Sequence, residues 1–206
     1  MKKFARIFLC WFLIILPAVE LLSLDKDKVF ENLKAKYSSA NSLKISFSLR
    51  NSSLQGTLAI QQPNLFRLVL NYDNLPEKII VCDGKTLWNY SPRNNNVIIS
   101  NILEEDSPSL QNFFTTILTN YTAHSLAKEI NSALGSSLLL TLKSAEAPSQ
   151  LVRIYLDNKF SIKAIDLDND DSTSFYIIKK IHFNPKFPKN YFHFLPPKGT
   201  EVFDYR

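Results

Sequence analysis

The chain has 206 residues and a net charge of +5, with 45% hydrophobic and 21% charged residues. This composition predicts a globular domain with a sizeable core and excludes disordered and fibrous proteins. The basic residues form no evident cluster on one predicted face, so the small net charge does not favour a nucleic-acid-binding protein.

The first segment has the pattern of a secretory signal peptide. Cationic residues open the chain, an apolar run covers residues 7–19, and Ser23 offers a small residue for cleavage. We expect residues 1–23 to be removed and residues 24–206 to form one exported domain. The alternative is an uncleaved membrane anchor, but the run of about 13 residues is shorter than the roughly 20 that span a bilayer.

One helix and several strands are predicted in the first half of that domain. Apolar residues recur at helical spacing in residues 25–41, which predicts a helix. Period-two alternation of apolar and polar residues then predicts strands, and the Asp83-Gly84 pair indicates a tight hairpin turn. The predicted strands cover residues 43–49, 58–60, 66–72, 78–82, 85–90 and 96–101.

The middle of the chain changes to helical patterns. Apolar residues at helical spacing follow Ser107 and predict a helix through Leu118. Residues 122–134 are interpreted as a second short helix that ends at Gly135. Strands resume at residues 138–142, 151–156, 161–167, 173–184 and 191–195.

These elements predict a mainly β protein built on one long antiparallel sheet. A sheet of about ten strands must curl or split. Helices that cover the concave side of a splayed sheet leave room for a ligand.

The sequence offers little for catalysis. His124, His182 and His193 lack the spacing of metal ligands, and no nucleophile elbow, phosphate loop or dinucleotide motif is present. Cys82 lies in an apolar stretch and is interpreted as a small core residue. We therefore expect a protein that is not an enzyme and that needs no metal or cofactor.

Three segments resemble the periplasmic outer-membrane lipoprotein carriers of the LolA family. They are residues 61–67 (QQPNLFR), 81–92 (VCDGKTLWNYSP) and 192–204 (FHFLPPKGTEVFD). They occur in the family order, and the resemblance covers nearly the whole exported chain.

The resemblance implies an incomplete antiparallel β-barrel, a curled sheet of about 11 strands, with a helical lid over an apolar cavity. It also implies a monomeric periplasmic carrier of acylated lipoproteins, without a cofactor or nucleic acid. Such a carrier receives lipoproteins from an inner-membrane ABC-type releasing complex and passes them to an outer-membrane acceptor. The residues expected to bind the acyl chains are Leu58, Ile60, Phe66, Leu68, Leu70, Ile79, Val81, Trp88, Tyr90, Phe113, Phe114, Ile117 and Leu118.

Two positions concern the transfer step that the resemblance implies. Phe66 matches a phenylalanine that faces the cavity and takes part in lipoprotein reception. Gln62 stands where the family often has a basic residue that helps hold the closed state. Arg67 is close to Gln62 in sequence but has the opposite strand parity, so we expect its side chain to lie on the other face of the sheet. It would then not replace the basic residue, and we expect a looser lid or a different way of holding the lid closed.

The sequence leaves three alternative functions to weigh. The same half-barrel could serve as a lipid-sensing regulatory module, although such proteins usually carry a second domain. An exported hydrolase is disfavoured because no nucleophile and base pair is evident. A membrane-anchored acceptor would need a lipobox cysteine, whereas Cys10 lies inside the apolar run rather than after it.

Overall fold

The computed structural model describes residues 24–102, 110, 113–114, 118–144, 150–169 and 172–206. The predicted signal peptide and Ile117 lie outside these residues. Within them, no helix combines the length and the apolar character needed to cross a membrane.

Twelve strands and two helices make up the described part of the chain. The helices are α1 (Lys26–Ser38) and the short α3 (Leu118–Asn120). The strands are β1 (Ser42–Leu49), β2 (Leu54–Gln61), β3 (Leu65–Tyr72), β4 (Leu75–Asp83), β5 (Thr86–Ser91), β6 (Asn96–Asn101), β7 (Tyr121–Asn131), β8 (Gly135–Ser144), β9 (Leu151–Leu156), β10 (Ile162–Asn169), β11 (Ser172–Phe183) and β12 (Glu201–Asp204).

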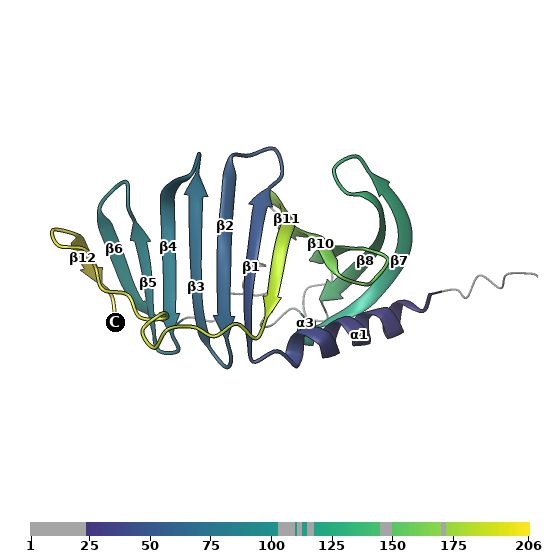
Figure 1. The fold of residues 1–206 in the computed structure, drawn as a ribbon, viewed down its shortest axis with the longest axis horizontal. Helices are drawn as coiled ribbons and strands as arrows, with labels where there is room; N and C mark the ends of the chain where they lie inside the picture. Colours follow the sequence, from purple (N-terminus) through teal and green to yellow (C-terminus); the bar gives the residue numbers. More distant parts are fainter. Residues whose placement is uncertain (1–23, 103–109, 111–112, 115–117, 145–149, 170–171) are drawn as a thin grey trace, which may run out of the picture.

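All twelve strands belong to one open sheet. The order is β12-β6-β5-β4-β3-β2-β1-β11-β10-β9-β8-β7, so β12 and β7 form the two edges. Figure 1 shows a broad part from β12 to β11 and a strongly curled part from β10 to β7, with α1 lying across one end of the curl. The predicted mainly β fold with a curled, incomplete barrel is confirmed.

Two predicted elements are wrong. Residues 122–134 are not a helix, because β7 pairs with β8 along almost its whole length. Ladder pairing here overrides the helical preference of residues such as Ala127 and Lys128. Residues 191–195 form no strand. The last strand is instead β12, which pairs with β6 in parallel, whereas the other described strands pair antiparallel.

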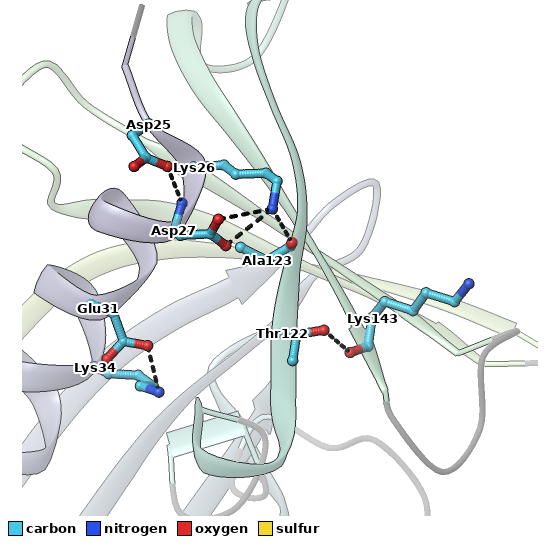
Figure 2. A network of polar contacts seen from close by, with 8 residues as sticks. All are labelled: Asp25, Lys26, Asp27, Glu31, Lys34, Thr122, Ala123 and Lys143. Carbon is cyan, nitrogen blue, oxygen red and sulfur yellow. Dashed lines mark hydrogen bonds and ion pairs between the residues drawn. The ribbon is translucent and has the colours of Figure 1, made fainter.

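Helix α1 is held at both its start and its buried face. The Asp25 side chain caps the helix by accepting a hydrogen bond from the Asp27 backbone N–H at 2.9 Å. Lys26 Nζ donates to the Ala123 carbonyl on β7 at 2.9 Å, as Figure 2 shows. The buried side chains Val29, Phe30, Leu33 and Tyr37 then join the main core.

That main core lies on the concave side of the sheet. It joins inward-facing side chains of β1, β2 and β8–β10 to α1 and to the buried residues Leu110, Phe113, Phe114 and Leu118. Gly56 on β2 leaves room for the Phe47 ring, because an added Cβ would lie 2.6 Å from Phe47 Cζ. The predicted helical cover over the concave side is therefore present where the structure describes it.

Candidate functional site

A pocket of about 610 Å³ opens at the end of the sheet where α1 meets the first strands. Its walls come from the last turns of α1, the residues just before β1, the turn after β2, and the segment that includes α3. The lining residues are Lys34, Ser38, Ala40, Asn41, Gln62, Phe114, Leu118 and Thr119. The volume lies within the range of about 300–1,000 Å³ that is usual for ligand pockets.

The rim of the pocket is polar and is fixed through its backbone. The Gln62 N–H donates to the Asn41 carbonyl at 3.0 Å. The Asn41 N–H donates to Asn184 Oδ1 at 2.8 Å, which ties the rim to the end of β11. Lys34 forms an ion pair with Glu31 at 2.8 Å, seen in Figure 2, and so points along α1. The entrance is therefore built by hydrogen bonds between segments distant in sequence.

The floor of the pocket is apolar and aromatic. Phe114 packs on Phe113 with ring centroids 4.8 Å apart and on Tyr37 at 5.4 Å. Both phenylalanines and Leu118 are buried in the main core, which continues beneath the concave side. Phe114 and Leu118 therefore supply apolar surface inside the pocket.

Eight of the thirteen predicted binding residues lie on this side of the sheet. Phe114 and Leu118 line the pocket itself. Leu68 and Leu70 on β3 are only partly buried against the main core, which leaves apolar surface open on the concave side. The other four are buried in that core and are Leu58, Ile60, Phe66 and Phe113.

Four predicted residues lie elsewhere. Ile79, Val81, Trp88 and Tyr90 pack in a separate cluster with Phe194. Adjacent residues of a strand face opposite sides, and Cys82 next to Val81 belongs to the concave core, so this cluster occupies the convex side. The sheet separates these four side chains from the pocket. Ile117, the remaining predicted residue, lies outside the described residues.

The convex cluster is covered by the segment that follows β11. Phe194 packs on Tyr90 with ring centroids 5.2 Å apart, and His193 meets Trp88 at 5.3 Å. Arg67 points to this side too, and its guanidinium donates to the Tyr191 carbonyl at 3.3 Å. The prediction that Arg67 lies on the face opposite to the cavity is thus confirmed.

The buried titratable groups near the pocket are held neutral. Burial raises the pKa of the Tyr37 hydroxyl, against the smaller opposing effect of a hydrogen bond with the Ile162 backbone. Burial also raises the pKa of the Cys82 thiol, which is fully enclosed, as expected of a core cysteine. Among the described residues, no three His, Cys, Asp or Glu side chains gather where they could hold a metal ion.

Sequence reasoning missed most of the polar rim. The rim forms where the end of α1, the start of β1 and the end of β2 meet. This meeting brings Gln62 together with Lys34, Ser38 and Asn41. The available signal was Gln62 itself, since the family resemblance already put it at a position that controls closure. Trp88 and Tyr90 indicated that a segment must cover the convex side. A strand with apolar side chains on both faces needs both faces shielded from water.

The family model described as "Outer membrane lipoprotein carrier protein LolA" matches residues 38–195. This range is well over half of the chain. The chain belongs to the LolA family. The match begins at the last residue of α1, includes every pocket-lining residue except Lys34 and most of the convex cover, and ends before β12.

Individual relatives of this LolA-family chain are distant. It is 29% identical over 155 residues to the outer-membrane lipoprotein carrier protein of Histophilus somni (strain 129Pt), covering 73% of this chain and 71% of the relative. It is 25% identical over 192 residues to the uncharacterized protein MJ0687 of Methanocaldococcus jannaschii, covering 87% of this chain and 54% of that protein. This chain therefore spans about half the length of MJ0687.

A solved structure shares the fold. It is an uncharacterized conserved protein of Thermus thermophilus, with a TM-score of 0.55 and 13% sequence identity. The superposition covers 88% of this chain and 100% of the other. At this identity the likeness supports the curled sheet and nothing more specific.

Proposed function

We propose that this LolA-family protein carries lipoproteins through the periplasm, with their acyl chains held in the pocket beneath α1 and the segment that includes α3. A cleaved signal peptide would export it as a monomer. It would then take its cargo from an inner-membrane ABC-type releasing complex and pass it to an outer-membrane acceptor. The observation that carries this proposal is the pocket with a polar rim and an apolar floor.

The chemistry of the pocket suits reversible binding of alkyl chains. Burying a methylene group is worth about 0.8 kcal/mol, so a lipoprotein with about three acyl chains would aggregate if it were released into water. Phe114 and Leu118 offer apolar contact in the pocket. Binding energy then depends on how much surface the walls cover, and opening them would release the cargo.

The proposal is tested by placing a charge on the concave side. Phe66 is 8% exposed and lies in the main core. Phe66→Glu is expected to reduce loading with a triacylated lipoprotein at least about tenfold, because a carboxylate in apolar surroundings is strongly unfavourable. Loading is measured by co-purification of the lipoprotein with the carrier.

The control is Val69→Glu on the same strand. Val69 has the opposite parity to Phe66, so the same charge is placed on the convex side. Leu68→Glu provides a second test at a side chain that is only partly buried and so less important for folding. Unchanged loading in folded Phe66→Glu and Leu68→Glu proteins would refute acyl-chain binding on the concave side.

A further inference from the structure

The charge of the chain is segregated, although its net value is small. Residues 32–72 and 172–200 together contain ten Lys and Arg residues and no Asp or Glu. The rest of the chain has 14 Lys and Arg against all 19 Asp and Glu. These two segments are neighbours in space, because β1 pairs with both β2 and β11. The acid-free strands β1, β2 and β11 therefore lie side by side in the sheet.

Three strands place cations on the convex side near one end of the sheet. Lys44 on β1 is the pairing partner of His182 on β11, and Lys180 lies two pairs further along, opposite Ser46. Their neighbours Leu43, Ile45 and Ile181 face the concave core, so these basic side chains face outward. Lys44 pairs with Ala59 on β2, and Ala59 pairs with Arg67 on β3. Lys44 and Arg67 are therefore on the same face, two strands and roughly 10 Å apart.

The segment after β11 adds two more cations over the same strands. Figure 1 shows this yellow segment crossing the ends of the strands near α1. It is fixed by the Ser42 hydroxyl, which donates to the Pro185 carbonyl at 2.8 Å, and by Arg67 at Tyr191. Lys186 and Lys189 are exposed on it. We call the resulting surface the basic face, made up of Lys44, Arg67, Lys180, His182, Lys186 and Lys189.

The basic face adjoins the pocket entrance. Asn41 lines the pocket and immediately precedes Ser42, which holds the segment bearing Lys186. The segment also carries aromatic rings, with Phe187 stacked on Tyr191 at 4.8 Å between centroids. Lysines interleaved with aromatic rings are typical of surfaces that rest on lipid headgroups.

We propose that the basic face docks this protein onto an anionic phospholipid bilayer, at the end of the sheet where the pocket also opens. The cations are spread over several strands instead of converging on one point, which suits the diffuse charge of many headgroups. None of the five Lys and Arg residues of the face forms an ion pair with a described residue. Docking therefore does not require a salt bridge within the described chain to break.

The test uses the protein as purified from an expressing cell and vesicles without any lipoprotein. Co-sedimentation is measured with vesicles of equal parts phosphatidylglycerol and phosphatidylcholine, and with phosphatidylcholine alone. The protein is expected to bind the vesicles that contain phosphatidylglycerol far more strongly than those of phosphatidylcholine alone. This binding is expected to weaken as the salt concentration is raised. The triple variant Lys44→Gln, Lys180→Gln, Lys189→Gln is expected to bind the anionic vesicles about 100-fold more weakly.

The control triple variant removes the same charge from exposed lysines elsewhere and is Lys28→Gln, Lys128→Gln, Lys198→Gln. It is expected to bind the anionic vesicles within about threefold of the unmodified protein. Equal weakening by both triples, or no gain from phosphatidylglycerol, would overturn the proposal. Binding of polyglutamate without binding of anionic vesicles would also overturn it and would indicate an acidic protein partner. Because the vesicles contain no lipoprotein, vesicle binding is measured separately from lipoprotein loading.

Discussion

Tyr37 lies where the last turn of α1 meets the concave side of the sheet. The side chain is 2% exposed, and burial raises the pKa of its hydroxyl above the ordinary value of 10.0. Above pH 10 the unfolded chain loses a proton that the folded protein keeps. The neutral hydroxyl therefore contributes its full stability below that pH, and the contribution is lost as pH rises toward the folded pKa.

We expect the free energy of unfolding to fall above pH 10, with Tyr37 contributing about 1.4 kcal/mol per pH unit. Tyr37→Phe should show a shallower fall, measured by urea unfolding across this range. Tyr205→Phe is the control, because Tyr205 is 71% exposed. A Tyr37→Phe protein with the same pH slope as the unmodified protein would contradict the account of this site.

Individual residues also show where sequence reasoning reached its limit. Phe66 and Arg67 were assigned to opposite faces from parity alone, and the pairing of β3 confirms this. Trp88 and Tyr90 could not be assigned in that way, since β5 has apolar side chains on its convex face and a partly buried Leu87 on the other. Their face is identified only by the pairing of Trp88 with Val81, which lies next to the core residue Cys82.

Helix α1 is the element that closes one end of the pocket. Leu33 is 1% exposed at the centre of its buried face, whereas Lys28 is exposed on the same helix. Leu33→Ala is expected to lower the free energy of unfolding by about 2–5 kcal/mol, because it leaves a cavity in the core. Lys28→Ala should change it by less than about 0.5 kcal/mol. Equal effects in urea unfolding would mean that α1 does not dock as described.

Elements with one buried face were predictable from sequence. Apolar and polar residues alternate in β1 and β3, and α1 has an apolar stripe. Each pattern indicates an element with one buried face. The misread element, β7, has most of its side chains exposed, so it shows little period-two signal beneath its Ala, Leu, Lys and Glu content. The final strand was missed because no residue of Glu201–Asp204 is buried and the strand is recognised by its parallel pairing with β6.

At the scale of the molecule, the open sheet creates one polar-rimmed entrance and one charged face at the same end. The fold class followed from the number of strands and the helical insertion. The entrance and the basic face did not, since each joins segments distant in sequence, as the hydrogen bond that ties the pocket residue Asn41 to Asn184 shows. Register and segment path, rather than local pattern, bring those residues together.

The central claim is that acyl chains are held on the concave side of the sheet, where the pocket beneath α1 opens. Native mass spectrometry of the protein purified from an exporting bacterium tests it most directly. The account predicts triacylated proteins bound to the unmodified protein and to Val69→Glu, and their loss from Phe66→Glu. Unmodified protein that carries no acylated protein, or only free phospholipid, would contradict it.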